Sequence, residues 1–499
     1  MDTSPEQAHQ RPLDIVVMAA GQGTRMKSRL PKVLHRLAGR SLLSRVLDTA
    51  IRLRPRRILV VTGHGAEQVE RAVSEMATQP VEANTDEAGM GAMYTPEVCC
   101  VRQIPQLGTG HAVQQAAPAL AEDGSVLVLN GDVPLVDFAT LQHLVAASAG
   151  SRLALLTIEL ADPTGYGRIV RGASTAGVLS HGKGPVQGIV EHKDASPDQR
   201  GIREIYTGML VAPGAALKRW LAGLQNDNAQ KEYYLTDIVG LAVVEGTEVV
   251  SIDADGALSV AGINSALQLA DLERAFQRRQ AETLMEAGVR LADPSRFDLR
   301  GTLDCGMDVE IDVNCLFEGD VVLGEGVRIG AHCVIANAHI DAGAVIHPFT
   351  HIDGEAAGVR VGADARVGPY ARLRPGAQLE RDVHVGNFVE IKNATLGAGA
   401  KANHLAYIGD AKVGERVNFG AGSITANYDG ANKHRTVIED DVHVGSNCVL
   451  VAPITLGAGG TVGGGSTLTT STEPGALTVA RARAVSFANW SRPVKKRKE

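Results

Sequence analysis

A period of six residues governs the C-terminal half of the chain and limits what it can fold into. Aliphatic side chains hold one register over two stretches, at Val361, Val367, Leu373, Leu379, Val385 and Ile391, and at Val444, Leu450, Leu456, Val462 and Leu468. Glycine often follows the aliphatic residue, as in Val361-Gly362. This pattern predicts a solenoid with short flat faces and tight corners, whose aliphatic side chains stack inside. A glycine-rich linker would not keep such a period.

The N-terminal half alternates apolar runs with amphipathic segments. Strands are predicted at residues 13–19, 57–63, 125–132 and 152–160, and helices at residues 41–53, 111–121 and 137–149. This alternation predicts an α/β domain with a doubly wound, mostly parallel sheet, which binds ligands at the carboxyl ends of its strands. Apolar residues at three- to four-residue spacing predict a helix between the halves. We therefore expect domains at residues 1–263 and 291–499, joined by a helix at residues 264–290.

Composition excludes several classes of protein. The 499 residues carry a net charge of −7, which argues against general nucleic-acid binding. No apolar stretch reaches the ~18 residues of a membrane span. The N-terminal residues also lack the apolar core of a signal peptide, so we expect no membrane insertion and a cytoplasmic location. The six cysteines form no CxxC pair, which is typical of free thiols in a reducing compartment.

A glycine-rich loop, MAAGQGTRMKSRLPKVL, follows the first predicted strand. Gly21 and Gly23 allow backbone N–H groups to approach a phosphate, and Arg25 and Lys32 add positive charge. A dinucleotide-binding fingerprint or a Walker A loop would need glycine at the position of Met26. Gly-x-Gly by itself would fit an ordinary turn equally well. The loop is therefore a candidate triphosphate site.

The full loop resembles that of the sugar-1-phosphate nucleotidyltransferases, and further motifs match that family in order. They are QLGTGHA at 106–112, NGDVPL at 130–135, PTGYGRIV at 163–170, GIVEHKDA at 188–195 and EYYLTDI at 232–238. Such a reaction brings two anions together, so Mg²⁺ with oxygen ligands is expected. Asp132, at a predicted strand end, is the natural ligand, although alone it would fit a turn equally well. The resemblance adds Asn264 as the second ligand.

The resemblance also implies the residues that bind UTP and the sugar. Arg25 and Lys32 are the expected catalytic cations. The implied contacts are Ala20, Gly21, Lys32, Gln103, Gly108, Thr109, Asn130, Gly131, Gly167, Glu191, Thr207 and Asn264, with uracil held at Gln103, Gly108 and Thr109. Tyr206 departs from the pattern, which commonly has Asn before Thr-Gly at a sugar contact. Residues 81–96 resemble an insertion, which we expect to be a surface loop.

The repeat half is similar to the hexapeptide-repeat proteins, whose fold is a left-handed parallel β-helix. That similarity implies trimers with active sites between adjacent subunits. Its register breaks at residues 396–404 and at the insertion ANYDGANKHRT. The motifs RLRP, HVGNFVEIKNA, KANHLAYIGDA and NFGAGSITANYDGANKHRT resemble the family of bifunctional N-acetylglucosamine-1-phosphate uridyltransferase/glucosamine-1-phosphate acetyltransferases. Both halves, their order and the helix between them match that family from residue 13 onward.

His404 is the candidate general base for the amine of glucosamine 1-phosphate, because an ordinary imidazole titrates at about 6.5. The implied contacts with the sugar phosphate are Arg374, Lys392, Tyr407 and Asn418, and those with acetyl-CoA are Ala421, Asn427, Tyr428, Ser446, Gly464 and Arg481. Glu390 would orient a neighbour. The family's cysteine is Ala426 here, which argues for direct attack on the thioester without an acetyl-cysteine intermediate.

Three hypotheses follow. A bifunctional transferase would make UDP-N-acetylglucosamine, a bacterial cell-envelope precursor, by acetyl transfer from acetyl-CoA and then uridylyl transfer from UTP. A monofunctional nucleotidyltransferase would use the solenoid only for assembly or effector binding. A regulatory subunit would have neither activity. A solenoid used only for assembly would not require His404 and the cations around it. A nucleotidyltransferase domain without activity would not require Asp132. We therefore predict the bifunctional enzyme, acting as a homotrimer.

Overall fold

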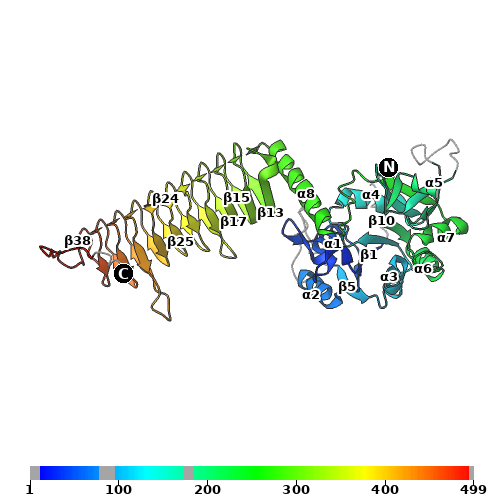
Figure 1. Cartoon of the computed structure of the whole chain (residues 1–499), viewed down its shortest axis with the longest axis horizontal. Coiled ribbons are helices and arrows are strands. Elements are labelled where there is room, and N and C mark those ends of the chain that lie inside the picture. The colour runs from blue at the N-terminus through cyan, green and yellow to red at the C-terminus, as the bar shows by residue number, and fades with distance from the viewer. Residues whose placement is uncertain (1–11, 78–95, 173–183, 494–499) are drawn as a thin grey trace, which may run out of the picture. The chain divides into compact units, whose positions relative to one another are not determined.

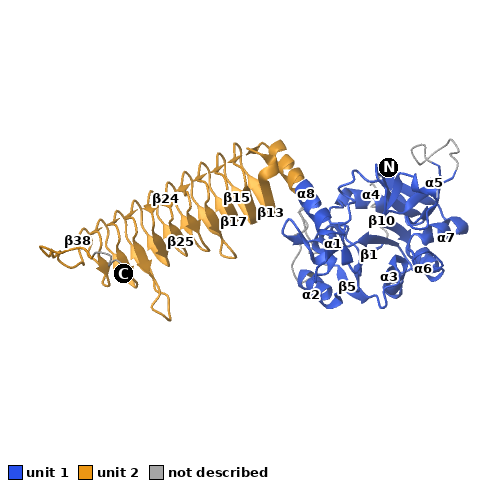
Figure 2. Cartoon of the chain, viewed as in Figure 1, with its two compact units in different colours: residues 1–275 blue, residues 276–499 orange. Residues whose placement is uncertain are grey.

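The computed structural model describes residues 12–77, 96–172 and 184–493 (Figure 1). The chain divides into two compact units, Met1–Ala275 and Phe276–Glu499 (Figure 2). The boundary falls inside helix α8, Ala266–Glu286, where the sequence predicts a helix. The expected insertion over residues 81–96 lies outside the described residues, apart from Pro96.

A nine-stranded sheet forms the centre of the first unit, with the main order β11-β7-β10-β6-β1-β4-β5 and with β8 and β9 at its side. The bounds are β1 Leu13–Ala19, β4 Arg57–Thr62, β5 Glu97–Arg102, β6 Ser125–Asn130, β7 Leu153–Glu159, β8 Arg168–Arg171, β9 Val186–Val190, β10 Glu204–Pro213 and β11 Val249–Asp253. Strand β1 is parallel to β4 and β6, whereas β10 is antiparallel to β6 and β7. The four predicted strands are confirmed as β1, β4, β6 and β7.

Helices cover both faces of this sheet. Their bounds are α1 Leu42–Arg52, α2 Ala66–Ala77, α3 Thr109–Ala116, α4 Phe138–Ser148, α5 Pro197–Arg200, α6 Gly214–Ala222 and α7 Asp237–Glu245. Along β6, Val126 and Val128 pack with residues of α3, α6 and α7. Leu127 and Leu129 point to the other face and pack with residues of α1, α2 and α4. Because successive strand side chains alternate, a continuous apolar strand such as β6 requires both layers.

The second unit is a parallel β-helix whose coils have three faces (Figure 1). One face contains β12 Arg290–Leu291, β14 Glu310–Ile311, β16 Arg328–Ile329, β18 Val345–Ile346, β21 Arg366–Val367, β24 His384–Asn387, β27 Lys401–His404, β30 Asn418–Phe419, β33 His443–Val444, β36 Thr461–Val462 and β38 Leu477–Thr478. The other two faces diverge after β17, because this strand pairs with both β19 and β20.

These two faces contain β13 Phe297–Cys305, β15 Cys315–Leu323, β17 Val334–Ile340, β19 His351–Asp353, β20 Val359–Val361, β22 Arg372–Leu373, β23 Gln378–Leu379, β25 Glu390–Lys392, β26 Thr395–Leu396, β28 Tyr407–Gly409, β29 Ala411–Val413, β31 Ile424–Ala426, β32 Thr436–Ile438, β34 Val449–Val451, β35 Ile454–Leu456 and β37 Thr467–Leu468. Each of the aliphatic residues that set the six-residue period is buried, with at most 3% exposed. Val367 pairs with Val385 and Leu373 with Ile391 in successive coils. The prediction of stacked aliphatic side chains is confirmed, and they occupy the interior of the solenoid.

One corner of the β-helix repeats a left-handed backbone conformation. Its members, which we call the corner column, are Asn314, His332, Phe349, Tyr370, Phe388, Leu405, Gly422, Asn447 and Gly465, with φ between 51° and 74°. From His332 onward, each corner N–H except that of Phe388 donates to the carbonyl of the residue that precedes the corner residue of the previous coil. The N–H of Phe388 donates to the carbonyl of Tyr370, the corner residue itself. We call five of these preceding residues the pre-corner column: Asn387, His404, Ala421, Ser446 and Gly464. The hydrogen bonds fix their order, one residue in each successive coil.

Candidate active sites

The glycine-rich loop after β1 brings its backbone close to Lys32. Gly23 has a left-handed φ of 60°, and a Cβ added there would lie 2.9 Å from Cβ of Lys32. Glycine therefore permits a turn and an approach that a larger residue would obstruct. Ala20 is buried, whereas Gly21 and Arg25 are exposed. The loop thus presents its backbone and the Arg25 side chain to solvent, and Gly23 packs close to Lys32.

Lys32 joins the two predicted metal ligands. It lies in a 3-10 helix, η2 (Lys32–Leu34), while Asp132 follows β6 and Asn264 precedes α8. The Lys32 ammonium contacts Oδ2 of Asp132 and lies 3.1 Å from Oδ1 of Asn264. The N–H of Ile263 donates to the backbone carbonyl of Asp132 at 3.1 Å, which holds the two segments together. Residues far apart in the sequence therefore meet close to the carboxyl end of β6.

A divalent cation fits this arrangement, because one carboxylate and one amide oxygen already face a positive group. The side chains of Lys32 and Asp132 are only 13% and 18% exposed, so a charge placed there is partly shielded from water. A cation such as Mg²⁺ is commonly held by one or two protein oxygens, with waters and substrate phosphates completing its shell. The ammonium of Lys32 supplies positive charge between Oδ2 of Asp132 and Oδ1 of Asn264.

The residues expected to hold uracil form one connected group. The Gln103 side chain follows β5 and donates from Nε2 to the carbonyl of Gly108 at 2.9 Å. Gly108 has φ 106°, and a Cβ there would lie 2.7 Å from the carbonyl oxygen of Tyr233. Oγ1 of Thr109 accepts from the N–H of Leu235 at 3.1 Å. This loop is therefore fixed by neighbouring backbone, with its polar groups presented together.

The residues expected at the sugar form two neighbouring pairs, Asn130 with Thr207 and Gly167 with Glu191. The Nδ2 of Asn130 is 3.4 Å from the carbonyl of Thr207, and the neighbouring Gly131 donates to the carbonyl of Met18 at 2.9 Å. A Cβ at Gly167 would lie 3.7 Å from Oε1 of Glu191, which belongs to the second pair.

Two of these side chains are already engaged within the protein. The hydroxyl of Thr207 donates to the carbonyl of Leu156 at 2.9 Å, so only its lone pairs are available to a ligand. Oε1 of Glu191 accepts from the hydroxyl of Thr236 at 3.1 Å. Burial raises the pKa of Glu191, and the nearby Asp237 adds to this effect.

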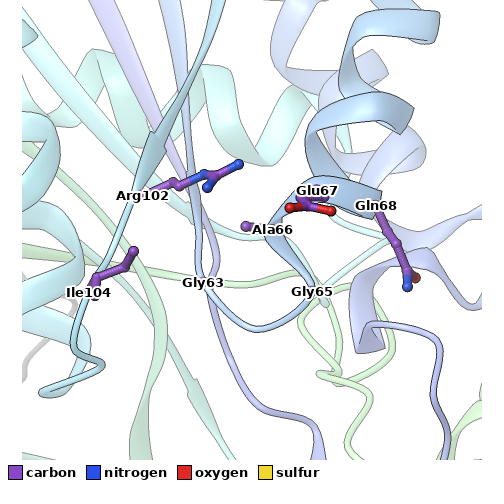
Figure 3. A pocket seen from close by; sticks show the side chains of 7 residues that line it. All are labelled: Gly63, Gly65, Ala66, Glu67, Gln68, Arg102 and Ile104. Carbon is purple, nitrogen blue, oxygen red and sulfur yellow. The ribbon is translucent and has the colours of Figure 1, made fainter.

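A pocket of about 300 Å³ lies beside the start of α2 (Figure 3). Gly63, Gly65, Glu67, Arg102 and Ile104 are among the residues that line it, and none of the predicted site residues does. Figure 3 shows the side chains of Arg102 and Glu67 near the strand end and the helix start. Arg102 is paired with a carboxylate on α2. The pocket adjoins the candidate nucleotide site, because a Cβ at Gly63 would lie 2.9 Å from Cβ of Ala20 and because Arg102 and Ile104 flank Gln103.

In the β-helix, three cations gather near one face. The Arg374 guanidinium donates from Nη1 to Oε1 of Glu390 at 2.7 Å, which supports the expected orienting role of Glu390. The pKa of Lys392 is lowered, first by its contact with Lys433 and then by the charge of Arg374. Three clustered cations form a site for an anion such as a phosphate. The sequence analysis missed Lys433, although it lies in the insertion that breaks the register.

His404 lies at the end of β27, exposed to solvent. Its Nδ1 is 3.0 Å from Oδ1 of Asn387, the residue paired with it in the preceding coil. The amide oxygen can only accept, so the hydrogen bond requires Nδ1 to carry the proton and leaves Nε2 as the basic atom. Sequence analysis did not single out Asn387. Tyr407 begins β28 shortly after His404 and pairs with Glu390, so it lies on the face that carries the cations.

The remaining polar residues of this half are held by other partners. Asn418 contacts Nδ1 of His443 at 3.2 Å. Asn427 is 9% exposed and donates to the carboxylate of Asp410. The Tyr428 side chain is 62% exposed, and its hydroxyl donates to the carbonyl of Gly430 at 2.6 Å. No hydrogen bond in the described ranges links these three side chains to His404, so this structure does not assemble the whole predicted group.

Three of the six predicted acetyl-CoA residues lie in the pre-corner column. Ala421, Ser446 and Gly464 follow His404 in successive coils, and parallel strands lie about 4.8 Å apart. Nη1 of Arg481 donates to the carbonyl of Gly464 at 2.6 Å, which brings the C-terminal segment to the same column. An extended ligand that follows this column would therefore lead from Arg481 to the imidazole.

The fold and the two sites define a class of protein: a nucleotidyltransferase domain joined to a hexapeptide-repeat β-helix. Residues 15–173 match the model of the MobA-like NTP transferase domain, and residues 435–470 match that of the hexapeptide repeat of succinyl-transferase. Among solved structures, a UDP-glucose pyrophosphorylase complexed with UDP-glucose covers 54% of this chain and 99% of its own, at 15% identity and a TM-score of 0.41. That score is too low to support any conclusion.

Full-length relatives define the family. The chain is 65% identical over 485 residues to the bifunctional protein GlmU of Methylibium petroleiphilum, covering 97% of this chain and 100% of the relative. It is 64% identical over 494 residues to that of an Acidovorax species (97% and 99%). It is 54% identical over 485 residues to that of an Azoarcus species (97% and 100%). The chain belongs to the GlmU family of bifunctional proteins.

Membership in this family confirms the predicted fold class, an α/β nucleotidyltransferase domain followed by a left-handed parallel β-helix. It also confirms a bifunctional transferase with uridyltransferase and acetyltransferase activities in UDP-N-acetylglucosamine synthesis. Its substrates are sugar phosphates and nucleotides, and a divalent metal ion is required. No helix in the described residues is long and apolar enough to cross a membrane.

Proposed function

We propose that the β-helix transfers the acetyl group of acetyl-CoA to glucosamine 1-phosphate, and that the first unit then transfers UMP from UTP to the product with release of pyrophosphate. The observation that carries this assignment is the pre-corner column. It places the candidate base His404 in line with Ala421, Ser446 and Gly464, which match coenzyme A positions by motif. A solenoid that served only for assembly would not require this alignment.

In the acetyl transfer, Nε2 of His404 takes a proton from the attacking amine of glucosamine 1-phosphate. The hydrogen bond of Nδ1 to Asn387 holds the imidazole in the required tautomer. The amine then attacks the thioester carbonyl directly, and the thiolate of coenzyme A leaves. Arg374, Lys392 and Lys433 neutralise the phosphate of the sugar.

Four further side chains complete the proposed acetyl site. Tyr407 and Asn418 bind hydroxyl groups of the sugar, while Asn427 and Tyr428 position the acetyl donor. Arg481 pairs with phosphates of coenzyme A, an assignment supported by its contact with Gly464.

In the uridylyl transfer, Asp132 and Asn264 would hold Mg²⁺, which supplies charge neutralisation at the phosphates when bound. Lys32 and Arg25 bind the triphosphate and stabilise charge on the pentavalent phosphorus, because both lie at the glycine-rich loop. Gln103, Gly108 and Thr109 bind the uracil. Asn130, Gly167, Glu191 and Thr207 orient the sugar so that its phosphate oxygen faces the α-phosphorus.

We further propose that the chain acts in the cytoplasm as a homotrimer, with acetyl sites completed by a neighbouring copy. Support comes from an exposed aromatic row in the corner column. His332, Phe349, Tyr370 and Phe388 stack with ring centroids 4.8, 4.9 and 5.4 Å apart. The last three are 45%, 49% and 57% exposed, and exposed apolar rows commonly mark protein interfaces. The row continues to Leu405, next to His404, so a copy that covers it would reach the acetyl site.

The test measures thiol release from acetyl-CoA with and without glucosamine 1-phosphate, and pyrophosphate release from UTP with N-acetylglucosamine 1-phosphate. Sugar-dependent thiol release that is lost in Arg374→Ala and retained in Arg366→Ala, an exposed arginine on another face, would support the site. Absence of thiol release from a folded protein that releases pyrophosphate would mean that the β-helix is structural.

A further inference from the structure

The Gln103 amide at the proposed uracil site has a fixed orientation. Its Nε2 has two neighbours, the carbonyl oxygen of Gly108 at 2.9 Å and Nδ1 of His111 at 3.2 Å. A carbonyl oxygen can only accept, so it requires the nitrogen rather than the oxygen of the amide on this side. Exchange of the two amide atoms would bring two oxygens into close contact. Both hydrogens of Nε2 are therefore directed into the protein.

His111 fits this arrangement as a neutral imidazole with an unprotonated Nδ1. The residue lies in the first turn of α3, and burial lowers its pKa. The partial positive charge at the start of a helix also disfavours an imidazolium. In the neutral state Nδ1 accepts from Gln103, and the proton is on Nε2. This second ring nitrogen lies 3.1 Å from the side-chain nitrogen of Gln115.

Gln115 can adapt to this tautomer, whereas Gln103 cannot. The other contact of the Gln115 amide nitrogen, with the backbone carbonyl of His111 at 3.4 Å, is long and weak. Rotation of the Gln115 amide by half a turn gives up that contact and presents its oxygen to the Nε2–H of His111. The hydrogen bond from Gln103 to Gly108 is shorter, at 2.9 Å. It therefore decides which nitrogen of His111 carries the proton.

This orientation leaves Oε1 of Gln103 available to a ligand. No donor to this oxygen is found in the described part of the chain, and it is not one of the fully buried polar atoms that lack a partner. Its chain neighbours Arg102 and Ile104 line the pocket beside α2. An amide oxygen only accepts hydrogen bonds. Uracil carries a hydrogen on N3, whereas N3 of cytosine carries a lone pair, so Oε1 matches uracil and opposes cytosine.

We propose that His111 is a positioning residue that sets the base specificity of uridylyl transfer. It accepts from Nε2 of Gln103 and so holds the amide with Oε1 toward N3–H of uracil, while it disfavours the reversed amide that would admit cytosine. His111 itself does not touch the nucleotide. The inference rests on the proposed function and deepens it, because it explains how the uracil contact discriminates UTP from CTP.

The experiment measures pyrophosphate release with UTP and with CTP for wild type, His111→Leu and His111→Asn. We expect His111→Leu to lower the ratio of kcat/KM for UTP to that for CTP roughly three- to tenfold, the effect of one neutral hydrogen bond. Discrimination should be weakened rather than abolished, because Gly108 still restrains the amide. His111→Asn should stay close to the wild-type ratio, since its Oδ1 lies near the position of Nδ1 and accepts the same hydrogen bond. Acetyl transfer should not change.

His143→Leu is the matched control, because His143 is an exposed histidine on α4. If His111→Leu does not fold, His111→Gln replaces it, since its amide oxygen reaches the position of Nε2 instead of Nδ1. The inference is overturned if the variant keeps the wild-type ratio, or if His111→Asn or His143→Leu lowers it as much. A wild-type protein that uses CTP as readily as UTP would instead overturn the proposed uracil site.

Discussion

The two candidate sites differ in how far a single chain shields their side chains from solvent. In the first unit, Lys32 and Asp132 are only 13% and 18% exposed, at the ends of strands covered by helices. In the β-helix, His404 is exposed and Tyr428 is 62% exposed. The physical difference is that stacked aliphatic side chains occupy the solenoid interior. A solenoid must therefore place its site on an outer surface, where a second copy can supply the enclosure that the first unit obtains from its own layers.

Asp132→Ala is the substitution with the largest expected effect on this comparison. Removal of the carboxylate eliminates one of two proposed metal ligands and leaves Lys32 without its ion pair. We expect uridylyl transfer to fall at least about a thousandfold, the scale of losing one strong electrostatic contribution. Acetyl transfer should be unchanged. Pyrophosphate and thiol release measured on the same sample decide the outcome, and loss of both activities in a folded protein would contradict separate sites.

His404→Ala should have the converse effect. Loss of the general base is expected to reduce acetyl transfer by about a hundredfold or more and to spare uridylyl transfer. His351→Ala is the control, because His351 is an exposed histidine on another strand of the β-helix. Acetyl transfer near the wild-type rate in His404→Ala would show that another group acts as the base.

Phe388→Asp tests whether the exposed site needs a second copy. A charge in the aromatic row should prevent the row from being covered, since burial of an unpaired carboxylate is unfavourable. We expect a smaller assembly by light scattering and at least a tenfold loss of acetyl transfer at low protein concentration. Uridylyl transfer should persist. Val244→Asp is the control, at an 89% exposed position of α7. An unchanged assembly with unchanged acetyl transfer would remove the row from the interface.

Lys433→Met should produce the smallest effect and has a defined pH signature. Loss of one charged hydrogen bond to a phosphate should raise KM for glucosamine 1-phosphate roughly tenfold. Lys392 has a lowered pKa because of Lys433, so it loses its charge as pH rises through that lowered value. Wild-type affinity should therefore weaken at alkaline pH.

In the Lys433→Met variant, the pKa of Lys392 should return upward, so the alkaline loss of affinity should move to higher pH. Measurement of KM across the alkaline range separates the two proteins. An identical pH profile for wild type and variant would contradict contact between the two lysines.

The patterns of apolar residues along the sequence predicted the fold. The strands around Val17 and Leu127 were recognisable because buried parallel strands are continuously apolar, and the aliphatic register at Val367 and Val385 indicated the stacked solenoid core. The first site was also largely predictable, since its motifs follow strand ends and such ends meet at one edge of a sheet. Lys433 was missed because it lies in an insertion that has no periodicity.

The sequence by itself determined the two folds and the residue types of both sites, because local periods and motif spacing are properties of the chain. Only the tertiary structure decided which coils align. The spacings between His404, Ala421, Ser446 and Gly464 are unequal, since an insertion lengthens one coil, and cross-coil hydrogen bonds alone place them in one column. The face that Tyr206 shares with Gly167 was decided in the same way, because the register between antiparallel strands determines which face each side chain occupies.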